Sequence, residues 1–170
     1  MKSATVFLVA LTVSFALFLG TSAAAVDSTT GGSIKVNDSV QKSLIAILNV
    51  NSGLIASAKQ DADNAIATAE GNDKETLGEV SAWLDDKGEV INQFKNEINS
   101  ALDSGDNENL ARVSTAITEA VAVKKAEWSK LMGKVENGEL KRNLNEKVNA
   151  NFANADLVDV AVKGVVCQSA

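Results

Sequence analysis

Apolar side chains recur at alternating steps of three and four residues along four successive segments of this 170-residue chain. In the second segment this spacing is sustained over about four heptads, which matches the turn of an α-helix and not the alternation of a strand. The sequence contains no proline, the strongest helix breaker. The pattern predicts an all-α protein. The spaced positions of the second segment are Leu77, Val80, Leu84, Lys87, Ile91, Phe94, Ile98 and Ala101.

Short polar stretches separate the four predicted helices. The first two helices cover about residues 39–70 and 73–104, and the fourth helix starts near Glu139. The third begins after Ser104-Gly105-Asp106 and stops at Asn137-Gly138, where glycine accepts the left-handed conformation. Such short connections place long successive helices antiparallel. We therefore predict an elongated up-down-up-down antiparallel four-helix bundle.

Caps and borders complete this prediction. Asn72 is expected to cap the second helix, because a glutamate follows it at the capping-box position. The bundle is expected to span residues 38–166, with a mobile tail at 167–170 and a flexible, glycine-containing leader at 26–37.

The N-terminus has the composition of a secretory signal. Lys2 precedes a 14-residue uncharged apolar run, and Ala23 and Ala25 then occupy the −3 and −1 positions of a cleavage site. The run is shorter than the roughly 20 residues that cross a bilayer. We predict a cleaved signal peptide at residues 1–25, an extracellular location and no transmembrane segment afterwards. The alternative is an uncleaved anchor at residues 4–26.

Composition argues against most catalytic chemistry. The sequence has no histidine and a single cysteine, which excludes Ser-His-Asp and Cys-His arrangements and the usual zinc sites. The close carboxylate pairs, Asp61 with Asp63 and Asp85 with Asp86, point to different faces of a helix. Signal removal takes one lysine from 16 basic and 22 acidic residues, which leaves a net charge of −7 that repels nucleic acid. We expect no enzymatic activity, metal or cofactor.

Charge is unevenly distributed along the chain. Residues 59–108 hold 13 acidic and 4 basic side chains, whereas residues 109–153 hold 5 acidic and 8 basic ones. We interpret this as charge complementarity between adjacent helices; the alternative is a molecule with an acidic and a basic face that steers a partner.

A basic amphipathic stretch lies in the third helix. Such a stretch can bind a membrane surface or a partner's groove. The same apolar residues also belong to the bundle seam, so core packing is the favoured interpretation. The candidate surface consists of Lys124, Lys125, Trp128, Lys130 and Lys134.

Three further features bear on function. Asn51 falls within the seam of the first helix, where a buried asparagine can set register. The apolar side chains of that helix exceed one seam, at Val40, Ile47 and Leu54, which favours a thick core over a lipid site or an oligomer contact. Asn37 begins an N-glycosylation sequon.

These observations predict a secreted non-enzymatic helical protein that acts as an extracellular interaction or structural module. Its partner would be another protein or a second copy of the chain. The alternative is a carrier that uses amphipathic helices to bind lipid or another small apolar ligand.

Cys167 is the one cysteine, and its position four residues from the C-terminus resembles a prenylation site. The signal sequence separates the chain from cytosolic prenyl transferases, so we expect an interchain disulfide and a homodimer. A capped or free thiol, and packing against the bundle end, are the alternatives. Reducing gels should convert a dimer band to a monomer band; the same monomer band on both gels would contradict the dimer.

Overall fold

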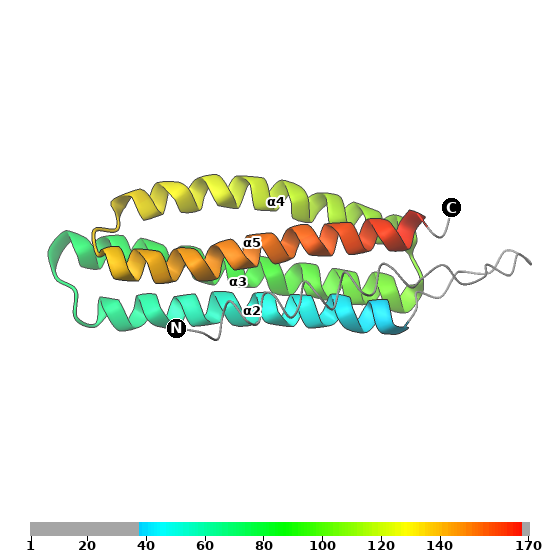
Figure 1. The fold of residues 1–170 in the computed structure, drawn as a ribbon, viewed down its shortest axis with the longest axis horizontal. Helices are drawn as coiled ribbons and strands as arrows, with labels where there is room; N and C mark the ends of the chain where they lie inside the picture. The colour runs from blue at the N-terminus through cyan, green and yellow to red at the C-terminus, as the bar shows by residue number, and fades with distance from the viewer. Residues whose placement is uncertain (1–37, 168–170) are drawn as a thin grey trace, which may run out of the picture. The chain divides into compact units, whose positions relative to one another are not determined.

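A computed structural model describes residues 38–167, which form four α-helices (Figure 1). These residues contain no strand, so the prediction of an all-α four-helix arrangement is confirmed. The predicted signal peptide, leader and Asn37 lie outside the described residues, as do residues 168–170. The helices are α2 (Asp38–Ile66), α3 (Gly71–Ser104), α4 (Asn107–Lys134) and α5 (Gly138–Cys167).

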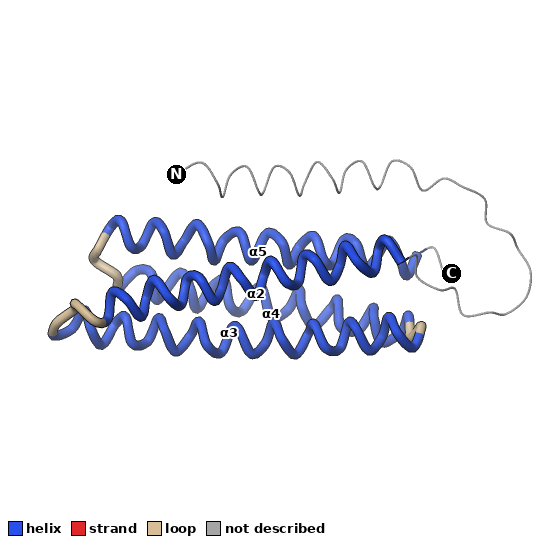
Figure 2. Tube along the Cα trace, turned by 90° about the horizontal axis from the view of Figure 1, so that it is seen from below, coloured by secondary structure: helices blue, strands red, loops and turns tan. Residues whose placement is uncertain are grey.

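Each helix packs mainly against two others. Helix α2 contacts α3 and α5, and helix α4 contacts the same two helices from the other side, so the four helices surround one core (Figure 2). Within residues 38–167 no helix combines the length and the apolar character needed to cross a bilayer.

The predicted seams form the core. Every seam position of α3 is buried except Phe94, which is half-buried. Each helix contributes one leucine that is at most 1 % exposed: Leu44, Leu84, Leu110 and Leu144. Burial of a leucine side chain contributes about 1.5–3 kcal/mol, so the 3-4 spacing determines which face of each helix turns inward. Of the three extra apolar residues of the first helix, Ile47 is buried and Leu54 is half-buried, while the side chain of Val40 lies outside the described set.

The first helix ends earlier than predicted, at Ile66 and not at residue 70. The backbone N–H groups of Thr68 and Ala69 both donate to the carbonyl of Ala65, at 3.2 and 3.0 Å, and the Thr68 hydroxyl donates to it at 3.3 Å. Three donors on one carbonyl close the helix with a tight turn. The alanine-rich composition of this stretch had favoured continued helix.

The predicted cap at Asn72 is wrong. Helix α3 begins at Gly71, two residues before the predicted start at 73, after an extended Glu70 whose side chain makes no capping hydrogen bond. Gly71 has φ +54°, a left-handed conformation that glycine adopts without the strain of a β-carbon. The backbone therefore turns into α3 at the glycine, and Asn72 already lies inside the helix.

The Asn137-Gly138 pair starts a helix and does not stop one. Helix α4 ends at Lys134, and the Asn137 side chain accepts a hydrogen bond from the Leu140 N–H at 3.0 Å, which caps α5. Asparagine is strongly preferred at a helix N-cap and also occurs after helix C-termini, so the sequence allowed both positions. The boundary at Gly105 is confirmed, because this residue closes α3 with φ +66°.

Replacing Asn137 with alanine should remove the cap of α5 and lower the free energy of unfolding by about 1 kcal/mol. Replacing Asn72 with alanine is the matched control and should change stability by less than about 0.5 kcal/mol. Urea unfolding of the two variants measures both effects. Equal destabilisation would contradict this assignment of the caps.

Candidate functional site

Trp128 belongs to the core and not to the predicted basic surface. Its side chain is 3 % exposed, and its ring centroid lies 4.8 Å from that of Trp83. Its indole N–H donates to the Asn145 side-chain oxygen at 2.8 Å. Phe152 completes the aromatic cluster, edge-on to Trp83 at 6.5 Å. The apolar half of the candidate surface is therefore used to pack the bundle.

Two lysines of that surface join α4 to α3. Lys124 contacts Asp86 at 2.6 Å and Glu127 at 2.9 Å, and Lys134 contacts Glu79 at 2.6 Å. Partial burial acts to lower the pKa of Lys124, but its hydrogen bonds to the two carboxylates outweigh that effect and raise it. These contacts support the interpretation of charge complementarity between helices.

The remaining lysines of the surface lie farther from the α3 interface. Lys125 approaches Asp156 of α5 at 3.6 Å, with both side chains largely exposed, and its Nζ lies 5.7 Å from the Phe152 ring centroid. Lys130 is exposed. The five residues are thus divided among the core, three interhelical ion pairs and solvent, and they do not form one basic surface.

The neighbouring carboxylates point in different directions, as expected. Asp61 binds Lys147 of α5, whereas Asp63 binds Lys59 at 2.8 Å and accepts a hydrogen bond from the Ser81 hydroxyl of α3 at 2.6 Å. The pair at 85–86 divides in the same way, between Lys59 and a lysine of α4. Neither pair forms a shared acid–base site.

A serine–lysine contact was not expected from the sequence. Lys59 Nζ lies 3.1 Å from the Ser81 hydroxyl oxygen, a separation that allows proton transfer between a serine nucleophile and a lysine base. The hydrogen bond to Asp63 raises the pKa of Lys59, aided by Asp85 and opposed by desolvation. The lysine is therefore protonated at neutral pH and cannot accept the serine proton.

A lysine lies in the middle of the core. Lys87 is 3 % exposed, although it occupies a seam position of α3, and its Nζ lies over the Phe152 ring at 5.1 Å from the centroid. Burial lowers the pKa of Lys87 to about 8; the positive charge of Lys124 lowers it further, while Asp86 opposes the shift. The contact with the ring face supplies part of the stabilisation that the buried ammonium lost with its water.

Two buried asparagines lie beside this lysine. The Asn151 side-chain N–H donates to the backbone carbonyl of Asn51 at 3.2 Å, which joins α5 to α2 at mid-length. Together with Lys87 they line a central cavity of about 20 Å³. Asn151 could have been found in the sequence, because the steps 144, 148, 151, 155, 158 and 162 alternate regularly between four and three. The apolar Phe152, the next residue along, is also buried, so a seam chosen by hydrophobicity contains Phe152 and omits Asn151.

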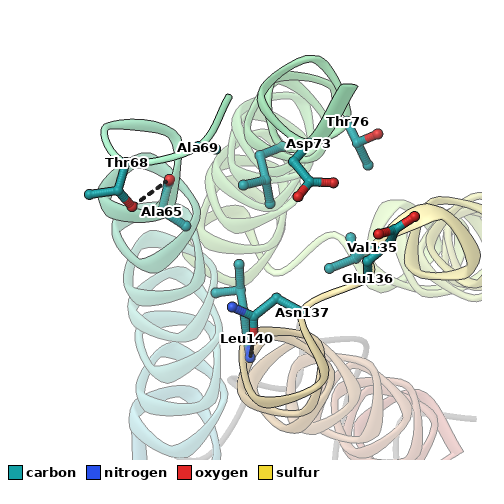
Figure 3. Close-up of a pocket in the computed structure, with 10 residues that line it drawn as sticks. Ala65, Thr68, Ala69, Asp73, Thr76, Val135, Glu136, Asn137 and Leu140 are labelled. Atoms are coloured by element: carbon teal, nitrogen blue, oxygen red, sulfur yellow. Dashed lines mark hydrogen bonds between the residues drawn. The ribbon is translucent and has the colours of Figure 1, made fainter. Parts of the chain in front are cut away.

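A second hollow lies at the end of the bundle where α2 passes to α3 and α4 to α5 (Figure 3). Its volume is about 220 Å³, and the small side chains of Ala65 and Ala69 leave room for it. The polar groups of Thr68 and Asn137 are already used to close the adjacent helix ends. Residues 38–167 contain no cluster of three or more side chains suited to a metal ion, so this hollow offers no metal site.

The outward face of α3 carries a continuous line of exposed residues. They are spaced by alternate steps of four and three, opposite the buried seam, and include five carboxylates and no lysine or arginine. We call this set the α3 outer line: Glu75, Glu79, Ala82, Asp86, Glu89, Gln93, Asn96, Ser100 and Asp103.

The other candidate residues of the sequence are only partly placed. Cys167 is the last residue of α5, and the position of its side chain is outside the described set. Asn37 directly precedes the described residues.

Comparisons with protein-family models, with curated proteins and with solved structures each find no match.

The buried charge of Lys87 should make stability depend on pH. The folded pKa of about 8 lies below the ordinary 10.5, so the unfolded chain binds more protons between these values. The free energy of unfolding should therefore rise with pH across this window, by up to about 3 kcal/mol from this group. Lys87→Met should remove that rise and stabilise the protein at pH 7.

Denaturant unfolding at pH 7, 8, 9 and 10 measures the effect, with exposed Lys130→Met as the control. The control should follow the native protein at every pH. Parallel curves for Lys87→Met and the native protein would contradict a buried, destabilising ammonium.

Proposed function

We propose that this chain is a secreted, non-enzymatic helical protein that acts as an extracellular interaction or structural module. The α3 outer line is the observation that carries the proposal. Its apolar neighbours along the same helix turn inward, so what α3 presents to its surroundings is mainly negative charge. A surface of this kind favours encounter with a positively charged protein partner.

Charge on the outer line is only partly neutralised within the bundle. Lysines of α4 contact Glu79 and Asp86. Glu75 and Glu89 are exposed and form no ion pair with other residues of the 38–167 range. Across the whole helix, α3 has eight acidic and three basic residues, and one of the basic residues is the buried Lys87. The uncompensated carboxylates give a partner with lysines or arginines a surface to pair with.

Two observations favour this function over the alternatives. The serine–lysine contact on α2 and α3 holds its lysine protonated, which does not suit a nucleophilic mechanism. The central cavity of about 20 Å³ and the hollow of about 220 Å³ at the bundle end are both smaller than the roughly 300 Å³ at which ligand pockets begin. A carrier of apolar ligands would need the helices to separate, whereas a binding surface needs no such change.

The proposal includes the up-down-up-down antiparallel topology. Polar contacts between α2 and α3 support it, since Gln41 meets Asp103 at one end and Lys59 meets Ser81 toward the other. Between α3 and α4, the contact of Glu79 with a lysine near the end of α4 follows the same order.

Secretion, cleavage of residues 1–25, a glycan on Asn37 and self-association through a Cys167 disulfide are parts of the same proposal. A 14-residue apolar run with a cleavage site supports the first two, and a single cysteine in an oxidising compartment supports the last. Native mass spectrometry of the secreted protein with and without reductant tests all four. An intact N-terminus and an unmodified monomer in both conditions would contradict them.

Neutralising the outer line should weaken partner binding. A partner recovered from the native fluid and then purified should bind the Glu75→Gln/Glu89→Gln variant roughly threefold to tenfold less tightly, and the difference should shrink with added salt. Glu136→Gln/Glu139→Gln, which removes two exposed carboxylates elsewhere, should bind as the native protein does. Titration calorimetry at two salt concentrations measures the effect.

Equal losses in the two variants would contradict a role for the α3 outer line. A protein that is monomeric and retains no partner from its native fluid would contradict the interaction function itself.

A further inference from the structure

Three polar side chains from three helices meet at the central cavity: Asn51 of α2, Lys87 of α3 and Asn151 of α5. All are at least 97 % buried. The rest of the lining is mainly aliphatic, with Phe94 and Ala120, on α3 and α4, the half-buried members of the lining. The lining is thus polar at these three side chains and apolar elsewhere, and the cavity is partly open to solvent.

The orientation of the Asn151 amide is set by one hydrogen bond. Because the side-chain N–H of Asn151 donates to the Asn51 backbone carbonyl, its Oδ1 is the free end of the amide. The Oδ1 atoms of both Asn51 and Asn151 are buried and have no hydrogen-bond donor among the described residues. A buried acceptor without a donor destabilises the folded state, so two such acceptors at one cavity favour a bound group that donates hydrogen bonds.

Lys87 has the opposite requirement. Its ammonium has three N–H donors and, among residues 38–167, no hydrogen-bond acceptor; its polar contact there is with the Phe152 ring. The same cavity is therefore lined by one residue whose donors lack an acceptor and by two residues whose Oδ1 atoms lack a donor. A group that both accepts and donates hydrogen bonds satisfies all three residues at once.

The volume of the central cavity determines which hydrogen-bonding group fits into it. A cavity needs about 10–15 Å³ to hold one water molecule, and this one has about 20 Å³. A cation would be repelled by Lys87, and an anion would face the two Oδ1 atoms. A water molecule accepts from the lysine and donates one hydrogen to each asparagine.

We propose that the central cavity is a binding site for one water molecule, held by Lys87 Nζ, Asn51 Oδ1 and Asn151 Oδ1. The water links α2, α3 and α5 at mid-length, since no direct hydrogen bond joins Lys87 to Asn51 or Asn151. This site is independent of the outer surface on which the proposed function rests.

Oxygen-17 magnetic relaxation dispersion of the full-length secreted protein tests the proposal, because it detects buried waters by their long residence times. The native protein should show such a water, and Asn51→Leu should show one fewer. The leucine removes Oδ1 and fills similar space, while the backbone carbonyl that Asn151 uses stays in place. Asn149→Leu is the control, since Asn149 is an exposed asparagine of α5 that does not line the cavity.

The control should retain the water that Asn51→Leu loses. Lys87→Met, which keeps the side-chain length but removes the donors, should lose it or shorten its residence time at least tenfold. Dispersion that is identical in the native protein and Asn51→Leu would overturn the proposal. A melting temperature that differs between chloride and gluconate in the native protein but not in Lys87→Met would overturn it in favour of an anion.

Discussion

Burial of four apolar seams against one another is the constraint on which the rest of this structure depends. With a single cysteine, the chain has no internal disulfide to hold its helices together, so the core supplies the stability. Leucines from all four helices are almost fully buried at its centre. Once each seam faces inward, the outward positions follow from helical geometry, and the α3 outer line is the geometric opposite of the α3 seam.

The same geometry explains why the charges are arranged as they are. Acidic α3 lies beside basic α4, and the contacts of Lys124 and Lys134 with α3 carboxylates consume much of the positive charge that the sequence concentrates in α4. What remains exposed is the excess of acid on α3. Surface ion pairs contribute little to stability, typically about 0–1 kcal/mol each. Their main consequence here is to set which charges are left for a partner.

Polar groups in the core work against this stability and therefore need a physical account. Lys87 and the two asparagines occupy positions where leucine or isoleucine would pack with no cost of desolvation. Their grouping at one cavity, with donors and acceptors in complementary positions, is consistent with a polar contact that fixes the relative register of three helices. This grouping places the buried ammonium of Lys87 next to the polar side chains of Asn51 and Asn151.

The sequence by itself determined the helical class, the approximate extent of the four helices and nearly every residue of the core, because each of these depends on local spacing of apolar side chains. It also indicated Asn51 and Lys87 as seam residues. Helix ends were less predictable. Asn137 suits both a helix start and a helix end, and the structure uses it at the start, where it accepts from the Leu140 N–H. Helix α3 begins at Gly71, in a left-handed backbone conformation that the capping pattern at Asn72 did not indicate. Tertiary structure alone decided which side chains from different helices meet. Burial of Trp128 against Trp83, the contact of Lys59 with Ser81 and the joining of Asn51 to Asn151 depend on the rotation and axial offset of packed helices, which the spacing within one helix does not specify.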